Sequence, residues 1–238
     1  MSDTPVIGVD GCRGGWLAAV WSPQRWVLEW VGYPNLAAIL LAYPDSLIGI
    51  DIPLGLWSHG DRPCDKAARK LLGKDRRSSV FAPPIPTGLD CATYAAANEA
   101  SREAIGKGIS KQSFELFPKM REGNSVVTPE IQHRVFELHP EVSFCGLAGE
   151  PMLYPKRTAE GFEERRELLN RELDLDSPIP VRRDMARKFQ AAGAMPDDAL
   201  DAAVAAWTVQ RVATGRAVRL RGDGSYRGAN GLIMEIVY

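Results

Sequence analysis

Two apolar runs of the chain each end in an aspartate. PVIGVD and SLIGIDIPLG are apolar up to Asp10 and Asp51, a pattern typical of central strands that are covered on both faces. WLAAVWS and RWVLEWVGY predict two further strands, and the short links GCRGG and PQ favour antiparallel hairpins. NLAAILLAY has helical spacing, with Asn35 as its expected N-cap. The predicted order is therefore β-β-β-α-β.

The remainder of the chain predicts helices and two more strands. We expect a strand in HRVFELHPEVSF, a polar helix near 158–173, a short helix in RRDMARKFQAAG, a helix from Pro196, and an edge strand in GLIMEIVY. Residues 57–130 are rich in Pro, Gly and charge, with helical pieces near 64–73, 90–105 and 110–121. They are interpreted as a helical insertion, or cap, beside the carboxyl ends of the central strands.

Composition narrows the class of protein. The 238 residues are 45% hydrophobic, enough for one large α/β domain over residues 1–238. The net charge of −1 attracts neither nucleic acid nor an anionic membrane by itself. No apolar stretch approaches the roughly 20 residues of a membrane span, and the chain does not open on a basic and then apolar leader. With four scattered cysteines and three scattered histidines, we expect no zinc site, no disulfides, no membrane partner and a cytoplasmic protein, while a homodimer stays open.

The aspartates at the strand ends are the first candidate site. Asp10 and Asp51 both follow the pattern aliphatic, Ile, Gly, aliphatic. Parallel neighbouring strands would place both carboxylates side by side, where ligands of open α/β sheets bind. Two like charges need a cation or a proton between them, and oxygen ligands suit Mg²⁺ or Mn²⁺. The alternative is that each aspartate only caps a turn.

The segment DDALDA adds acids near the start of the predicted last helix. Asp197 and Asp198 lie in its first turn after Pro196, where acids complement the helix dipole and cap the helix. Asp201 shares a face with Asp198 and is flanked by small alanines. These alanines would let the helix lie close to the sheet and bring Asp201 towards Asp10.

This combination resembles the ribonuclease H-like superfamily: a strand-end Asp, three antiparallel strands, a helix, a second strand-end acid and a late helix with D-x-x-D. Its RuvC-type resolvase branch is the most similar in arrangement. Nearly the whole chain is similar to domain-of-unknown-function family 429, described as predicted RNase H-like nucleases. The motifs that carry this likeness are GVDGCRGGW, IGIDIPLGL, SVFAPP, VFELHPEVSF and DDALDAAVAAW. The resemblance implies an α/β fold with a mixed sheet, three antiparallel strands and then parallel strands, flanked by helices.

The resemblance also implies site residues. Asp10 and Asp51 would be the acids of the first and fourth strands, and Asp198 and Asp201 those of the last helix. The expected chemistry is phosphodiester hydrolysis with two divalent ions, with Asp10 bridging, Asp51 and Asp201 completing the shells, and Asp198 as a weaker ligand. Glu137 is expected to approach from a neighbouring strand. It has no clear counterpart in the resolvase branch, and neither has Glu141.

Candidate substrate-binding residues are more ambiguous. His139 is either a proton carrier or part of a strand-end turn with Pro140. DGCRGG with Arg13 either cradles a phosphate or makes a tight hairpin. Lys66, Arg69 and Lys70 belong to a run with six basic residues against two acids over 65–77, which indicates a nucleic-acid contact or a solvated helix face. The tryptophans mostly fall at expected core positions, so base stacking is not indicated.

Three functions are compatible with these features. The first is a metal-dependent nuclease acting on DNA or RNA, or on a small phosphoester. The second is a phosphotransferase of the actin-like ATPase and sugar-kinase class, which needs two such domains and so a longer chain. The third is a non-catalytic nucleic-acid or protein binding module that retains the acids, an alternative that the near-neutral net charge keeps open. A measurement of Mg²⁺ or Mn²⁺ binding distinguishes the nuclease from the non-catalytic binding module.

Overall fold

The structure, a computed structural model, describes residues 4–238, which form two compact units. The first unit contains the residues up to Asp51 together with Arg134–Val218 and Val237–Tyr238. The second contains Ile52–His133 and Arg219–Ile236, so that the expected insertion of residues 57–130 falls within it. Among residues 4–238, no helix combines the length and apolar character needed to cross a membrane.

The first unit is built on a five-stranded mixed sheet of order β3-β2-β1-β4-β5. Its strands are β1 (Val6–Cys12), β2 (Gly15–Ser22), β3 (Val27–Tyr33), β4 (Ile48–Ile50) and β5 (Val135–Glu137). The first three are antiparallel, and β4 and β5 run parallel to β1. The mixed α/β architecture is therefore confirmed. The helix between β3 and β4, α1 (Leu36–Ala42), is also confirmed, and Asn35 Oδ1 accepts a hydrogen bond from Ala38 N at 2.9 Å.

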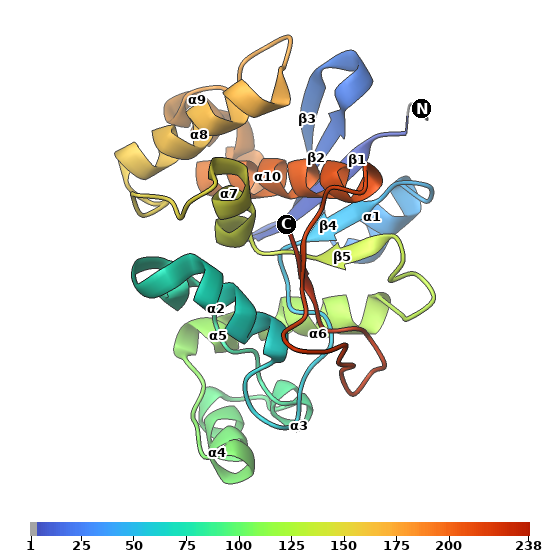
Figure 1. The fold of residues 1–238 in the computed structure, drawn as a ribbon, viewed down its shortest axis with the longest axis vertical. Coiled ribbons are helices and arrows are strands. Elements are labelled where there is room, and N and C mark those ends of the chain that lie inside the picture. Colours follow the sequence, from blue (N-terminus) through green and yellow to red (C-terminus); the bar gives the residue numbers. More distant parts are fainter. Residues whose placement is uncertain (1–3) are drawn as a thin grey trace. The chain divides into compact units, whose positions relative to one another are not determined.

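Helix α10 (Pro196–Ala213) lies across the strands of the sheet (Figure 1). Gly8 and Gly49 are register partners on β1 and β4, and neither leaves room for a side chain. A Cβ on Gly8 would lie 2.0 Å from Ala202 O, and one on Gly49 would lie 2.6 Å from Val209 Cγ2. The two glycines therefore let the alanine-rich side of α10 approach the strand backbones directly.

Three more helices complete the first unit: α7 (Pro140–Ala148), α8 (Ala159–Leu173) and α9 (Arg182–Phe189). The helices expected near 158–173 and 182–193 are confirmed. The strand predicted through HRVFELHPEVSF is wrong in its second half, because Pro140 starts a helix. Proline fits the first helical turn, where its missing N–H has no partner to lose. Phe144 and Phe162 are buried in the core between these helices and α10.

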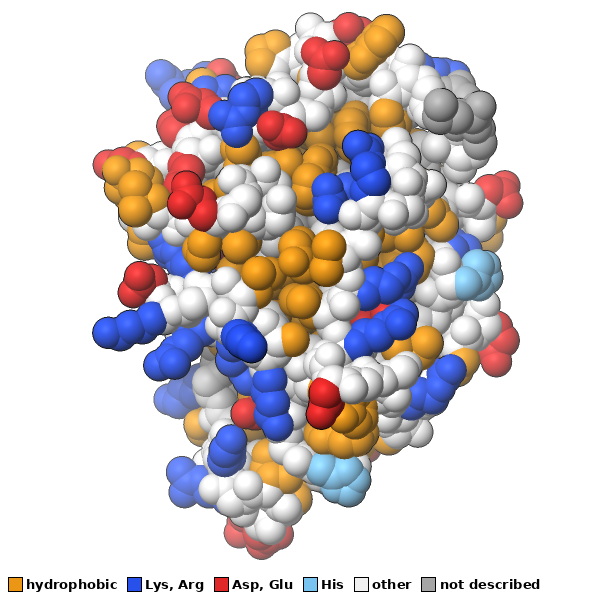
Figure 2. Space-filling view, viewed as in Figure 1, with side chains coloured by type: hydrophobic (Ala, Val, Ile, Leu, Met, Phe, Trp, Pro, Cys, Tyr) orange, Lys and Arg blue, Asp and Glu red, His pale blue; other side chains and the backbone are white. Residues whose placement is uncertain are grey.

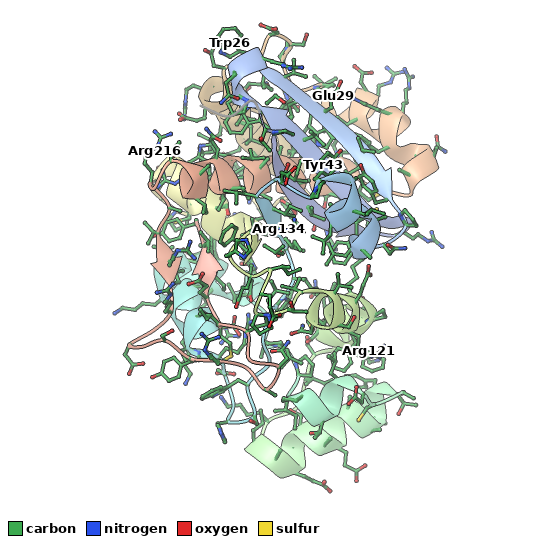
Figure 3. All side chains as sticks on the ribbon, turned by 90° about the vertical axis from the view of Figure 1, so that its right-hand side faces the viewer. Trp26, Glu29, Tyr43, Arg121, Arg134 and Arg216 are labelled. Atoms are coloured by element: carbon green, nitrogen blue, oxygen red, sulfur yellow. The ribbon has the colours of Figure 1, made fainter. Side chains whose placement is uncertain are left out.

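The β2–β3 hairpin carries a tryptophan at its tip, where Figure 3 shows Trp26. Its backbone is left-handed, with φ 53°, and the residue is 51% exposed. At the other end of the sheet, Arg134 Nη1 donates to Tyr43 O at 3.3 Å, and Tyr43 packs edge-on against Tyr33. Trp26 is thus an exception to the expected core positions of the tryptophans.

The second unit is mostly helical, as expected for the inserted segment. Its helices are α2 (Pro63–Arg76), α3 (Pro86–Leu89), α4 (Tyr94–Ile105), α5 (Lys111–Glu115) and α6 (Phe117–Val126). The C-terminal edge strand is shorter than predicted. β7 (Ile236–Val237) pairs with β6 (Arg219–Leu220) in a separate two-stranded sheet.

Candidate metal centre

The carboxylates of Asp10 and Asp51 come from adjacent parallel strands. β1 and β4 pair up to Val9, and Asp51 N continues the ladder by donating to Val9 O at 3.0 Å. Side chains alternate along a strand, so Asp10 lies on the face of Gly8, and Asp51 on that of Gly49. This is the face against which α10 packs.

Helix α10 brings a third carboxylate to the same place. Asp201 directly precedes Ala202, whose carbonyl lies over Gly8, and Asp201 is only 1% exposed. Burial raises the pKa of Asp10 well above its ordinary value, and the charges of Asp201 and then Asp51 raise it further. Burial also raises the pKa of Asp201. The three acids are therefore electrostatic neighbours, with Asp10 and Asp201 buried and Asp51 half-buried.

Asp51 has a cationic neighbour as well as anionic ones. Burial raises its pKa to about 6, the positive charge of His139 lowers it, and the charge of Asp201 raises it. His139 directly precedes α7, at its N-cap position. The structure thus brings the predicted proton carrier His139 near Asp51.

Lys156 is the residue of this centre that the sequence patterns do not indicate. Its Nζ lies 2.5 Å from Asp201 Oδ2. The charge of Asp201 raises the pKa of Lys156, and Asp10 and Asp51 add to this effect. The ammonium group is therefore protonated and partly neutralises the three acids. Lys156 lies in a loop 45 positions from Asp201, where no periodic pattern marks it.

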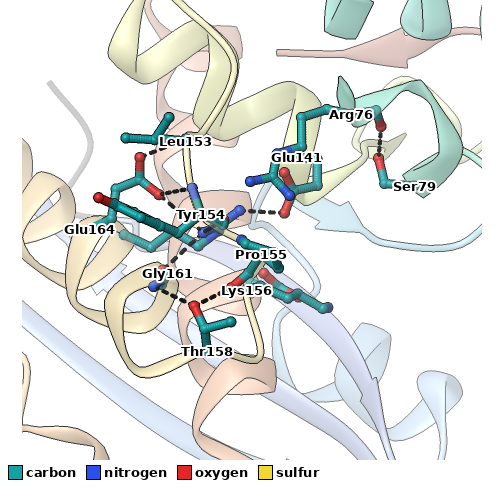
Figure 4. A network of polar contacts seen from close by, with 12 residues as sticks. Arg76, Ser79, Glu141, Leu153, Tyr154, Pro155, Lys156, Thr158, Gly161 and Glu164 are labelled. Carbon is teal, nitrogen blue, oxygen red and sulfur yellow. Dashed lines mark hydrogen bonds and ion pairs between the residues drawn. The ribbon is translucent and has the colours of Figure 1, made fainter. Parts of the chain in front are cut away.

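A buried ion pair holds the loop that carries Lys156 (Figure 4). Arg165, which is 1% exposed, donates from Nη2 to Glu141 Oε1 at 2.6 Å and from Nη1 to Tyr154 O at 3.1 Å. Glu164 accepts from Tyr154 N at 3.1 Å. Glu141 also contributes a negative charge that raises the pKa of Asp201. The loop is thus fixed from both of its ends, α7 and α8.

Asp198 has a structural role in the helix. Its Oδ2 accepts a hydrogen bond from Met195 N at 2.8 Å and so caps α10, as the capping interpretation predicted. Burial raises the pKa of Asp198 to about 6, while the bond from Met195 lowers it. Its charge is the weakest of the four neighbours that affect Asp10. Asp198 therefore lies at the margin of the centre.

Glu137 is not brought to this face of the sheet. It pairs in register with Ile50 of β4, and Ile50 points to the face opposite Asp51 because neighbouring strand residues alternate.

Arg13 is exposed in the β1–β2 turn, and its backbone N donates to Gly193 O at 3.2 Å. Gly14 leaves no room for a side chain against Ala192 O. The glycines of this turn are therefore explained by the hairpin and its close packing.

The remaining predicted substrate-binding residues belong to the second unit. Lys66 and Lys70 are exposed on α2. Arg69 Nε donates to Val80 O at 3.0 Å, and its Nη1 lies 3.7 Å from Asp61 Oδ2. Arg69 is thus engaged within its own unit, whereas the two lysines extend to solvent.

The candidate ligands of the centre are carboxylate oxygens. Buried Asp10 and Asp201 and half-buried Asp51 face one ammonium group and one imidazole. Burial raises the pKa of all three carboxylates, and the charge of Asp201 raises those of Asp10 and Asp51 further, so their charged forms are disfavoured. A divalent cation would stabilise those charged forms, and carboxylate oxygens are ligands that Mg²⁺ and Mn²⁺ accept.

The five-stranded sheet and its helices define a mixed α/β protein. Its cluster of aspartates lies where the last helix, α10, packs on the sheet. The chain belongs to the family described as "Protein of unknown function (DUF429)", whose model matches residues 8–224. This confirms the family to which the motifs pointed. No curated protein and no solved structure is significantly similar to the chain.

Proposed function

We propose that this protein is a metal-dependent nuclease with an RNase H-like fold. The observation that carries the proposal is the grouping of Asp10, Asp51 and Asp201, from two parallel strands and the last helix. Burial raises the pKa of all three, and the charge of Asp201 raises those of Asp10 and Asp51 further. Buried carboxylates are costly unless opposite charges compensate them, and Lys156 supplies one positive charge to three acids. The grouping of these three carboxylates is explained if they bind a divalent cation when the protein is active.

The residues would divide the work as follows. Asp10, Asp51 and Asp201 would hold Mg²⁺ or Mn²⁺, and Asp198 supports the start of α10. Bound divalent ions lower the pKa of a coordinated water and stabilise the leaving oxygen of a phosphodiester. His139, beside Asp51, is placed to carry a proton. Lys156 orients Asp201 and keeps a positive charge beside the acids, where it also attracts a phosphate.

A second candidate, the non-catalytic binding module, is favoured by one observation. The ion pair between Lys156 and Asp201 supplies a cation from the chain itself. In such a module this ammonium would be the lasting cation of the centre, and added metal would have no effect on the protein. The two functions therefore differ in metal binding as well as in activity.

A cleavage assay tests the proposal. End-labelled DNA and RNA oligonucleotides are incubated with Mg²⁺ or Mn²⁺, with EDTA as the metal-free reference. Wild type should cleave only with metal, and Asp10→Asn should reduce the rate by several orders of magnitude. Asp45→Asn makes the same change of charge at an exposed loop position and should cleave normally. Cleavage that persists in Asp10→Asn would contradict the proposal.

A further inference from the structure

The exposed side of α2 in the second unit is strongly basic. Residues 65–77 contain six basic residues and two acids, but Asp65 does not contribute to the surface charge. It is 1% exposed and forms an ion pair with Arg62, whose Nη2 lies 2.7 Å from Asp65 Oδ1. Asp75 is then the one exposed acid within residues 65–77, and of the six basic residues Arg69 is paired with Asp61 outside this segment. Figure 2 shows Lys and Arg side chains gathered over α2.

Two hollows adjoin each other along this helix. One, of about 530 Å³, is lined mainly by basic residues, and the other, of about 580 Å³, is lined by Trp57 and Tyr226. Lys66 and Lys70 line both hollows. They are four positions apart and so lie on the same side of the helix. The two lysines thus form the border between a cationic hollow and an aromatic one.

The aromatic hollow is formed by rings that hold one another in place. Trp57 and Tyr226 pack edge to face, with ring centroids 5.6 Å apart, and Trp57 also packs edge-on against His59 at 5.1 Å. Tyr226 Oη donates to Asp223 Oδ1 at 2.5 Å. Trp57 is only half-buried, so it is, like Trp26, an exception to the mostly core positions expected of the tryptophans. Part of its ring remains available to a ligand.

We propose that this surface, defined by Trp57, Lys66, Lys70 and Tyr226, binds single-stranded nucleic acid. The lysines would contact successive phosphates, and an unpaired base would pack against the aromatic rings. Aromatic side chains bind bases of any sequence, but only bases that are not stacked within a duplex. That the ligand is a nucleic acid rests on the proposed nuclease function. The surface adds that this nucleic acid is single-stranded.

Fluorescence anisotropy in EDTA measures this binding without cleavage. The probes are a labelled single-stranded DNA, a single-stranded RNA of the same sequence, and the corresponding duplex. Wild type should bind at least one of the single strands more tightly than the duplex. Trp57→Ala should weaken single-strand binding by about five- to 150-fold, while Trp57→Phe should retain most of it. Melting curves establish that both variants remain folded.

The lysines are tested through the salt dependence of binding. The double variant Lys66→Ala with Lys70→Ala should reduce the slope of log K against log salt by about 1.4, because each phosphate contact of a single strand contributes about 0.7. Lys74 lies in the same segment beyond the kink at Gly73 and lines neither hollow, so Lys74→Ala should change the slope least. Equal affinity for single strand and duplex, or folded Trp57→Ala that binds like wild type, would overturn the inference.

The same probes separate this inference from the proposed function. If wild type binds single strands but cleaves none with Mn²⁺, the nuclease proposal fails and the binding surface stands. If it cleaves with metal but does not prefer single strands in EDTA, the binding surface fails alone.

Discussion

Lys156 Nζ lies 2.5 Å from Asp201 Oδ2, although the two residues are 45 positions apart in the chain. Asp201 is buried in α10, whereas Lys156 comes from a loop that the buried Arg165–Glu141 ion pair holds in place. The chain therefore supplies one positive charge to its own group of acids. The stability of a Lys156 variant with and without Mn²⁺ measures whether this charge and a metal ion neutralise the same acids.

Lys156→Met should destabilise the metal-free protein by about 1–3 kcal/mol, because it leaves the buried Asp201 without its cation. In a protein of this size, each kcal/mol lowers the Tm by about 2–4 °C. Mn²⁺ should then raise the Tm of Lys156→Met more than that of wild type, since the ion takes over the neutralisation. Arg157→Met changes the charge equally at an exposed neighbouring position and is the control. If Mn²⁺ raised the Tm of Lys156→Met less than that of wild type, the Lys156 ammonium group and the metal ion would not neutralise the same carboxylates.

The metal-free protein should lose stability as the pH rises. The folded-state pKa of Asp51 is about 6 against an ordinary 3.8, so between these values the folded state binds more protons than the unfolded state. The free energy of unfolding then falls with rising pH, and this loss is complete above the folded-state pKa. In EDTA, melting curves between about pH 4 and 8 should show a smaller decline for Asp51→Asn than for wild type. Identical declines would exclude this role of Asp51.

Gly8→Ala should displace α10. The added Cβ would lie 2.0 Å from Ala202 O and 2.2 Å from Ala206 N, and backbone atoms cannot move away as a flexible side chain can. We expect a loss of about 1–3 kcal/mol or more together with weaker Mn²⁺ binding. Gly32→Ala on β3 meets only Ala192 Cβ, at 3.4 Å, and should be tolerated. Gly8→Ala with the stability of wild type would contradict the close packing of helix and strand.

The sequence predicted the parts of the fold that depend on local patterns. The apolar runs located β1 to β4, and Asn35 and Pro196 marked the starts of α1 and α10. The second half of the predicted strand from residue 133 failed because Pro140 suits a helix start as well as a strand end. A strand pattern cannot distinguish the two.

The site was predictable to the same extent. Asp10, Asp51 and Asp201 were recognisable because strand ends and a helix face place them by local rules. Glu137 could not be assigned to a face without the register between β4 and β5. Lys156 reaches Asp201 through a loop, and the contacts of a loop residue depend on tertiary packing that no periodicity encodes. The half-buried position of Trp57 was hidden for the same reason.

The central claim is that Asp10 belongs to a metal site and does not merely cap a turn. Melting curves of wild type and Asp10→Asn, each with EDTA and with millimolar Mn²⁺, test it most directly. Asp10→Asn keeps the shape of the side chain but removes one of the charges that repel each other. We predict that Mn²⁺ raises the Tm of wild type but not of Asp10→Asn, and that metal-free Asp10→Asn melts no earlier than wild type. A wild type without a Mn²⁺ shift and an Asp10→Asn that melts earlier would contradict the metal site.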